Sequence, residues 1–590
     1  MMRNCHIVIT FVCMMLVSGF RQAHANSITY PKDSVSMDFN ESLCLFTDRN
    51  LYAAGEKILF SAFIINSPSS EEYEWSKVIY LELISANSSP VFQAKYPVTE
   101  MKTDGYLQLP ENLLTGNYYL KAYTRWMRNF SSSAYAWLQV KVINPFQAGV
   151  GNAGEFTEVE KEEKFIPVNK NFRKTGITCQ TDKVRYNRRD KVVLNLTVPP
   201  GLNNLPENYC VSVIRPGAID TINYGLHCLL PDKNMSIYPL KYIPDVRGLS
   251  LSGMVIEKST RLGVSQAHVR LSVLGDNAEY SSFLTHENGG FLFALRPYHG
   301  TKDMYIAVEP KEDMSLEILV DNDYANDSPA FSRQPFKLSQ EEKETATELM
   351  LHYQIEKAYL EGISDTTGSS DTGIRRFFYG KPANTIYIDD YIKLPTIEEV
   401  IFELVPEVSV IRRNDLYYLR SRNYISDLEV YRPLILIDNI PVSDIGTMLK
   451  MSPERIERID VTDRIYAKGD LLFGGILNLI SRKGDMAGID LPKNSYFFNF
   501  DGFVQNDNKM LSVIENQTSD PRIPDVRNCL YWNPSVRIVP GTTTKIEFQT
   551  SDRTGNYMIV VRGVTEEGTI IEGISVFDVE SSGMQDVDDD

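Results

Sequence analysis

The sequence predicts a mainly β, multidomain protein, in which tandem β-sandwiches are joined to one small α/β domain. Three observations favour this fold class. Segments rich in β-branched and aromatic residues recur between clusters of turn-forming residues, as is typical of sandwiches. A pattern that begins at Thr47 returns at Thr181, which indicates two domains of one kind. From residue 383 onward, short strand-like segments alternate with helical ones, which indicates a mixed domain.

The first 25 residues have the composition of a secretion signal. Arg3 supplies a positive charge, residues 7–20 are almost wholly apolar, and a small-x-small cleavage site ends at Ala25. We therefore expect an exported protein that begins at Asn26. An uncleaved anchor is the alternative, which the short apolar run disfavours. No later apolar run is long enough for a helical span, so we expect no transmembrane segment.

Charge and cysteine content narrow the function classes. The formal net charge is −17, and loss of the signal with its two arginines makes it −19. Nucleic acid is a poor partner for such a chain, because its binding depends on Lys and Arg that neutralise phosphates. Five widely spaced cysteines follow the signal, which predicts neither a disulfide framework nor a CxxC metal site. Cys210 and Cys228 could form one bridge, and buried free thiols are the alternative.

The first sandwich is predicted over residues 40–145, where KILFSAFII, VIYLELIS, NYYLKAYTRW and AWLQVKVI read as strands. Within it, TDRNLYAAGEKILFSAFI matches TDKVRYNRRDKVVLNLTV, which begins at Thr181. The coinciding residues are Thr47/Thr181, Tyr52/Tyr186, Glu56/Asp190 and Lys57/Lys191. We interpret each copy as a charged corner with a Tyr packed at the start of a core strand. A second sandwich is therefore expected over residues 170–245.

This motif resembles the TD+xxYxxG stretch that opens the macroglobulin-like (MG2) domains of the α2-macroglobulin superfamily. The first copy keeps the glycine as Gly55, whereas the second has Arg189 there. The later GNYYLKAYTRWMRNF is similar to the end of such domains in secreted Bacteroidetes-type proteins. The resemblance implies macroglobulin-like, or Ig-like, β-sandwiches at both places.

A third, smaller sandwich is predicted over residues 248–335. It shows an opening strand at Gly253–Glu257, the strand VRLSVLG, and the pattern T-x-E-N-G-x-F at Thr285–Phe291. Asn288-Gly289 suits a tight hairpin, where positive φ is needed. This segment resembles the carboxypeptidase regulatory-like domain, a prealbumin-like sandwich. The resemblance implies an accessory domain without peptidase activity.

Residues 338–373 are predicted to form a helix and a linker. Ser339 and Glu342 have the spacing of a capping box, and Leu349 and Tyr353 continue at helical spacing. The helix should therefore be amphipathic, with about five turns. The segment GISDTTGSSDTG at 362–373 has the composition of a flexible linker.

The α/β domain is predicted over residues 383–485. Thr396 caps an amphipathic helix, Asp438-Asn439 suits a two-residue turn between apolar strands, and Ser452 caps a further short helix. IDNIP, IERIDV and GGILNLISRKG follow in the order of vDGvP, IerIeV and GvInIxTKkG, motifs of the TonB-dependent receptor plug domain. The segment resembles that domain, with Asn439 in place of the usual Gly.

Residues 486–580 are expected to form a C-terminal β domain. The 105 residues after Asp485 are too few for a receptor barrel of about 22 strands with ~10 residues each. The whole chain thus resembles Bacteroidetes-type secreted proteins that join macroglobulin-like, regulatory-like and plug-like domains without the barrel.

The sequence indicates no catalytic, cofactor-binding or metal-binding residues. The five histidines after the signal lack ligand spacing, and there is neither a nucleophile elbow nor a phosphate-binding glycine loop. The thioester signature of trapping macroglobulins, a Cys followed shortly by Glu-Gln, is absent. The acidic end at Asp586–Asp590 is expected to be a solvated tail.

We therefore expect a non-enzymatic, exported cell-envelope protein that binds or scaffolds at the outer membrane, on its periplasmic or surface side. Its expected partner is a protein, such as a separate barrel protein or an uptake complex. No nucleic acid and no cofactor are expected. A plug or accessory component of TonB-dependent nutrient import is one alternative function, and a macroglobulin-like protease inhibitor is another.

Overall fold

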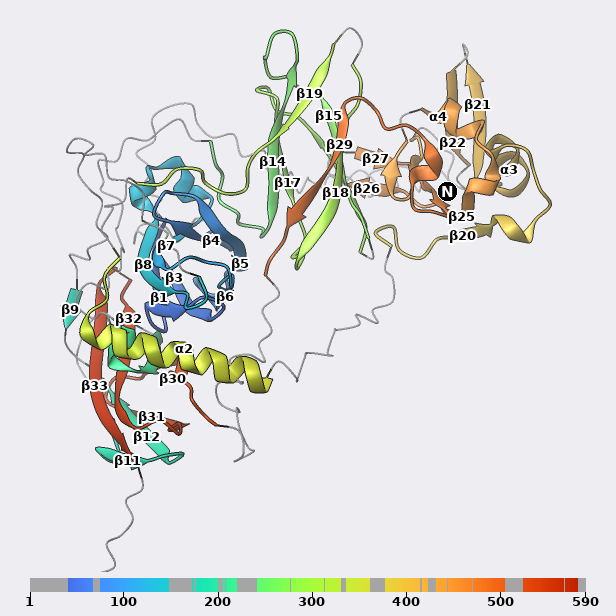
Figure 1. Cartoon of the computed structure of the whole chain (residues 1–590). Helices are drawn as coiled ribbons and strands as arrows, with labels where there is room; N and C mark the ends of the chain where they lie inside the picture. Colours follow the sequence, from blue (N-terminus) through green and yellow to red (C-terminus); the bar gives the residue numbers. More distant parts are fainter. Residues whose placement is uncertain are drawn as a thin grey trace, which may run out of the picture.

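The computed structural model shows a mainly β protein of several domains (Figure 1). It describes residues 41–66, 75–147, 172–174, 177–199, 205–206, 208–219, 241–275, 277–311, 314–329, 336–360, 377–413, 416–422, 431–442, 444–468, 471–504, 524–566 and 568–581. The predicted signal, the linker at 362–373 and the acidic end lie outside these residues. No helix in the described part of the chain combines the length and apolar character needed to cross a membrane.

The first sandwich packs a three-stranded sheet, β1-β3-β6, on a five-stranded sheet, β2-β8-β7-β4-β5. Its strands are β1 (Glu41–Thr47), β2 (Leu51–Ala53), β3 (Lys57–Asn66), β4 (Val78–Ser85), β5 (Pro90–Pro97), β6 (Lys102–Gln108), β7 (Gly116–Tyr123) and β8 (Ala136–Ile143). Facing side chains such as Phe60, Tyr96 and Leu138 are fully buried between the two sheets. This apolar interior is the largest core of the molecule and continues toward the neighbouring domains.

The second sandwich repeats this topology strand for strand, with sheets β10-β12-β31 and β11-β33-β32-β13-β30. Its strands are β10 (Thr178–Thr181), β11 (Arg185–Asn187), β12 (Lys191–Thr197), β13 (Asn208–Ile214), β30 (Cys529–Arg537), β31 (Thr543–Gln549), β32 (Gly555–Val564) and β33 (Ile570–Glu580), with β9 (Phe172–Lys174) beside β33. Even the parallel pair β2–β8 has a counterpart in β11–β33. The repeat predicted from one short motif therefore extends over eight strands.

A large insertion splits the second sandwich. Ile214 at the end of β13 lies opposite Cys529 at the start of β30, where the first sandwich has the short hairpin between β4 and β5. We expected residues 170–245 and 486–580 to form two separate domains, and their strands instead share both sheets of one sandwich. The two ends of a hairpin turn are close together, so a folded unit whose own ends are close can replace the turn without disturbing the pairing.

The two motif copies form the same hydrogen-bonded corner. The Tyr52 hydroxyl donates to Asp48 at 2.8 Å, and the Tyr186 hydroxyl donates to Asp182 at 2.6 Å. Arg189, which replaces Gly55, keeps the left-handed backbone with φ 57° against 89°. A bidentate ion pair with Asp552, at 2.6 Å for both contacts, holds the Arg189 side chain. The charged-corner interpretation is therefore confirmed.

The small sandwich packs the sheet β17-β14-β19 on the sheet β16-β15-β18-β29. Its strands are β14 (Ser250–Glu257), β15 (His268–Val273), β16 (Glu279–Leu284), β17 (Gly290–Ala294), β18 (Thr301–Val308), β19 (Leu316–Val320) and β29 (Ser495–Asp501). The last strand comes from beyond the boundary expected at residue 335, because the α/β module is inserted before it. Gly289 has φ 80°, as its turn requires. The expected hairpin at Asn288-Gly289 is wrong, since β16 and β17 belong to different sheets.

The α/β module contains a mixed sheet, β20-β25-β28-β23-β24, and two separate two-stranded ribbons. Its elements are β20 (Asn384–Tyr387), α3 (Ile397–Leu404), β21 (Val408–Arg413), β22 (Leu416–Ser421), β23 (Leu434–Ile437), β24 (Ile440–Pro441), α4 (Ile445–Leu449), β25 (Ile456–Thr462), β26 (Tyr466–Lys468), β27 (Leu471–Phe473) and β28 (Ile476–Ser481). The Thr396 side chain accepts a hydrogen bond from the Glu399 amide and caps α3 as predicted. Ser452 caps only one 3-10 turn, Pro453–Arg455.

Helix α2 (Gln340–Leu360) lies against both large sandwiches (Figure 1). Ser339 and Glu342 form the predicted capping box, with bonds of 2.7 and 3.1 Å. Leu349 is fully buried in a cluster with residues of β2 and β8. Glu348 forms ion pairs with Arg215 at 3.0 Å and Arg553 at 3.2 Å, both in or beside the second sandwich. The helix therefore joins the two sandwiches into one base.

Buried charged side chains join the small sandwich to the first sandwich. The Lys95 ammonium lies 2.6 Å from the Asp323 carboxylate, 2.6 Å from the backbone oxygen of Asp501, and over the ring of Phe500. Lys121 donates to the backbone oxygen of Ala325 at 2.6 Å. Removing the partners of a buried charged side chain is strongly unfavourable. These contacts therefore hold the small sandwich in one orientation on the base.

The cysteines differ from the expectation. Cys44 is disulfide-bonded. Cys179, Cys210 and Cys529 are free thiols. The alternative of a bridge between Cys210 and Cys228 is therefore wrong, and Cys210 is a buried thiol in β13.

Candidate functional site at the seam of the two inserted domains

The α/β module docks on the outer face of the four-stranded sheet of the small sandwich. Tyr305 of β18 is fully buried and packs with the hydrophobic core of the module. The Ser272 hydroxyl of β15 donates to the backbone oxygen of Asn439 at 2.9 Å. Elsewhere along this seam, Lys468 forms an ion pair of 2.7 Å with Glu279. The seam therefore combines apolar packing with specific polar contacts.

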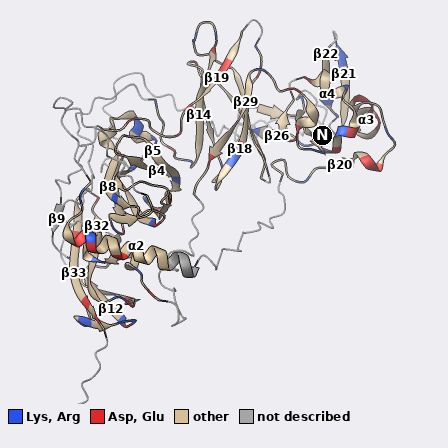
Figure 2. Ribbon diagram, in the orientation of Figure 1, with Lys and Arg blue, Asp and Glu red and all other residues tan. Residues whose placement is uncertain are grey.

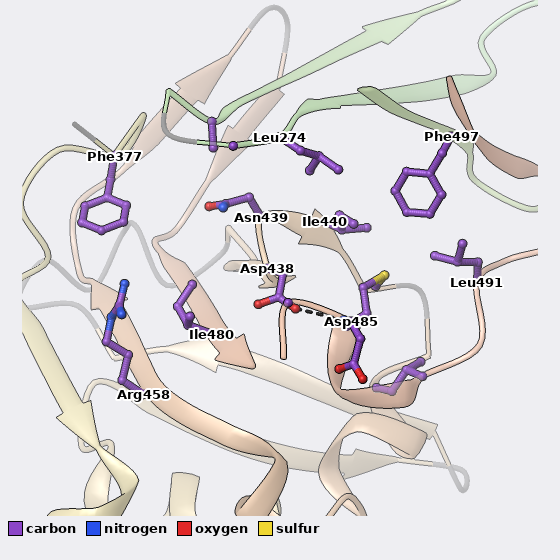
Figure 3. Close-up of a pocket in the computed structure, with 15 residues that line it drawn as sticks. Leu274, Phe377, Asp438, Asn439, Ile440, Arg458, Ile480, Asp485, Leu491 and Phe497 are labelled. Atoms are coloured by element: carbon purple, nitrogen blue, oxygen red, sulfur yellow. Dashed lines mark hydrogen bonds between the residues drawn. The ribbon is translucent and has the colours of Figure 1, made fainter. Parts of the chain in front are cut away.

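A cavity of about 610 Å³ lies in the seam (Figure 3). Figure 3 shows Phe377 and Arg458 at one end of the cavity and Leu491 and Phe497 at the other. Leu274 contributes a further apolar wall from the small sandwich. A volume of this size between two domains, with apolar walls and few polar groups, is typical of ligand-binding sites.

The backbone on the module side of the cavity has an unusual conformation. Asp438 and Asn439 have φ values of 50° and 67°, and Met486 and Ala487 both have 54°. These are four of the ten described non-glycine residues with positive φ. A left-handed conformation costs roughly 1 kcal/mol or more for such residues and tends to concentrate at functional sites. The other six lie in the sandwiches, so what distinguishes the cavity wall is that two adjacent left-handed pairs meet there.

The Asp438 carboxylate holds both strained turns in place. One oxygen accepts the Ser481 amide at 2.8 Å, and the other accepts the Ser481 hydroxyl at 2.6 Å and the Met486 amide at 2.9 Å. Both carboxylate oxygens therefore accept hydrogen bonds within the module. Its role in the site is to position the wall of the cavity.

A buried polar chain runs from the cavity into the module. The Asn478 amide donates to the Asn439 side chain at 2.9 Å and to the Tyr379 hydroxyl at 3.1 Å. Tyr379 in turn donates to Asp460 at 3.0 Å. Burial and the Asp460 carboxylate raise the pKa of Tyr379 well above its usual value, so the hydroxyl keeps the proton it donates. The bond from Asn478 also holds the Asn439 side chain in its left-handed turn.

Arg458 supplies the cation of the cavity. Its Nε lies 3.4 Å from Asp460, its guanidinium lies 5.8 Å from the centre of the Phe377 ring, and a contact of 3.6 Å joins it to Glu457. In the described part of the chain no group of three or more His, Cys, Asp or Glu side chains is placed to hold a metal ion. The arrangement provides apolar contact along the cavity and one cation, Arg458, at one end, which suits binding.

The sequence predicts no residue of this cavity as a site. It predicts Asp438-Asn439 only as a turn, and the pairing of Ile437 with Ile440 confirms that turn. A lone asparagine among the apolar residues of β28 could have pointed to Asn478. Nothing in the sequence brings Leu274 or Phe497 to the same place, because their strands lie in another domain.

No family model matches the chain, and no curated protein matches it. Among solved structures, trypsin-activated alpha-2-macroglobulin from Escherichia coli is similar over 92% of this chain and 42% of its own, at 9% identity and a TM-score of 0.22. Salmonella alpha-2-macroglobulin reacted with methylamine is similar over 92% of this chain and 40% of its own length, at 9% identity and a TM-score of 0.23.

A third similar structure is the adhesin InvE of Yersinia pseudotuberculosis, which covers 48% of this chain and 60% of its own, at 12% identity and a TM-score of 0.13. The chain spans about two fifths of the length of the two macroglobulins. TM-scores this low do not establish a shared arrangement of domains.

Proposed function

We propose that this chain is an exported, non-enzymatic protein of the cell envelope that binds a protein partner at the outer membrane through its α/β module. One observation carries the proposal: the module is an insertion within an insertion, displayed at the end of the molecule away from the base (Figure 1). Binding residues are commonly carried on surface segments that a rigid scaffold positions, which supports recognition by the module.

The way in which the module is attached to the rest of the chain supports this role. Strand β29 returns from the module and pairs with β18 over seven positions, from Thr301 opposite Asp501 to Ala307 opposite Ser495. The small sandwich is itself held on the base by the buried Lys95 joint. A module fixed at both levels keeps its orientation when a partner binds, which lowers the entropy lost on binding.

The resemblance of the module to receptor plug domains supports a separate barrel protein or uptake complex as the partner. It also supports the narrower candidate function of an accessory component in TonB-dependent nutrient import. Deletion of the protein separates the two: import requires it in the narrower role, whereas a general scaffold leaves uptake at its normal rate.

Site-specific photo-crosslinking in intact cells tests the proposal. The probe residue is placed at Ile392 or Phe402, which are 83% and 79% exposed on the module. The matched control is Val184, which is 76% exposed on the second sandwich. We expect a discrete adduct with one envelope protein from the module positions and none from Val184. No adduct at any position, or the same adducts at all three, would overturn the proposal.

A further inference from the structure

The ribbon of β21 and β22 is a second exposed feature of the module, separate from the seam cavity. It forms its own two-stranded sheet and is not part of the main sheet. On its inner face, Val408 and Leu419 are buried with Val400 and Ile401 of α3. Figure 1 shows the ribbon projecting at the end of the molecule far from the two large sandwiches. On its outer face Ile411, Arg413, Leu416 and Arg420 are exposed, whereas Ser409 and Tyr418 are half-buried. The Arg432 guanidinium lies 4.8 Å from the centre of the Tyr418 ring.

The outer face of the ribbon alternates arginine with apolar side chains. Three cross-strand pairs form it: Ser409 with Arg420, Ile411 with Tyr418, and Arg413 with Leu416. Residues directly opposite each other on antiparallel strands share a face. Leu416 is 59% exposed beside the turn and Ile411 is 38% exposed. Both arginines are exposed as well.

The charge of the ribbon is opposite to that of the chain. Residues 408–422 contain four arginines against one aspartate, a net charge of +3 in a chain of net charge −17. Figure 2 shows this basic tip beside α3, whose charged residues are three glutamates. An acidic body with a basic tip is oriented by a negatively charged surface, since the body is repelled and the tip attracted.

We propose that this ribbon docks on an anionic phospholipid surface. Arg413 and Arg420 pair with lipid phosphates, while Leu416 and Ile411 enter the boundary between headgroups and acyl chains. Tyr418 lies at headgroup depth, where an aromatic ring with a polar tip is stable. The exposed aliphatic side chains favour a lipid surface over free phosphate, which offers them no apolar contact. The inference rests on the proposed function for the protein's access to a membrane.

Vesicle flotation with the purified mature chain, residues 26–590, tests the inference. The probes are vesicles of phosphatidylcholine alone and of phosphatidylcholine mixed with phosphatidylglycerol. We expect binding to the mixed vesicles only, weakened by added salt. Arg413→Gln and Arg420→Gln should each weaken it about fivefold, the usual effect of one basic residue near an anionic surface. Leu416→Ala should weaken binding at both low and high salt.

Two matched controls lie on the same module outside the ribbon. Lys393→Gln removes an exposed cation, which lies 3.0 Å from Glu454, and Phe402→Ala removes an exposed apolar side chain of α3. Both should bind the mixed vesicles like the unaltered chain. Unchanged thermal unfolding of all five variants shows that each remains folded.

The proposal is overturned if the chain binds both vesicle types equally or neither, or if the ribbon variants bind like the controls. Inorganic phosphate that displaces the chain more than sodium chloride of equal ionic strength would assign the site to free phosphate. Ribbon variants that abolish the protein adducts but keep vesicle binding would make it a protein-docking surface. Flotation uses no partner protein, so a failure of vesicle binding does not affect the photo-crosslinking result. A failure of photo-crosslinking likewise does not affect the flotation result.

Discussion

Acid should loosen helix α2 through one histidine. His352 lies on α2 at the junction of the two large sandwiches, and its Nδ1 atom is shielded from solvent. Burial, together with the charges of Arg49, Arg553 and Arg527, lowers its pKa to about 3. The folded state therefore disfavours the protonated ring, which the unfolded chain accepts near pH 6.5.

The sign and size follow from proton linkage. A group that binds fewer protons when folded contributes stability above its unfolded pKa and loses it as the pH falls. For a folded pKa of about 3, the loss begins near pH 6.5 and reaches about 2 kcal/mol at pH 5. His352→Gln removes the titrating group. Between pH 8 and pH 5 the variant should therefore lose about 2 kcal/mol less stability than the unaltered chain.

Amide hydrogen exchange of residues 341–352 measures this, with exchange rates corrected for the intrinsic effect of pH. The opening free energy of α2 is compared at pH 8 and pH 5 in the unaltered chain and in His352→Gln. Gln354→Ala, an exposed change on the same helix, serves as the control and should keep the full pH dependence. Equal pH dependence in the chain and in His352→Gln would refute the reasoning.

Four further substitutions probe the cavity, the corner and the base. Asp438→Ala removes three hydrogen bonds from two strained turns and should destabilise the module by about 2–4 kcal/mol, as measured by chemical unfolding. A loss under about 0.5 kcal/mol would show that Asp438 does not hold these turns. Tyr52→Phe should lower the stability by about 1–3 kcal/mol and Tyr186→Phe by less than about 1 kcal/mol, because Asp48 is buried whereas Asp182 is exposed. Equal losses of stability in thermal unfolding would contradict this. Leu349→Ala should cost about 2–4 kcal/mol and speed exchange in α2, and unchanged exchange would mean that the helix is held by its ion pairs alone.

The local elements were predictable because their determinants are close in sequence. The capping box of Ser339 and Glu342 and the cap at Thr396 depend on contacts three residues apart. The corner motif depends on contacts within a dozen residues, which is why Tyr52 and Tyr186 could be compared directly. Arg189 shows where such matching weakens, since its left-handed backbone is held by Asp552, far along the chain.

The order of the domains along the chain was harder to predict, because strand pairing takes no account of sequence distance. β13 reads as a complete strand whether its partner follows at once or begins at Cys529. β29 similarly reads as the start of a new domain, although its partner β18 ends at Val308. In both cases the neighbouring strand satisfies the open backbone groups of an edge, which no local pattern records.

The sequence by itself determined the β-rich class, the repeated corner, the capped helices and the turn at Asp438-Asn439, since each depends on short-range propensity and hydrogen bonding. Only the tertiary structure decided that the second sandwich is split, that α2 joins the two copies, and that a cavity forms where Leu274 and Phe497 face the strained turns. The physical reason is that burial and strand pairing act between surfaces, and surfaces are brought together by the fold.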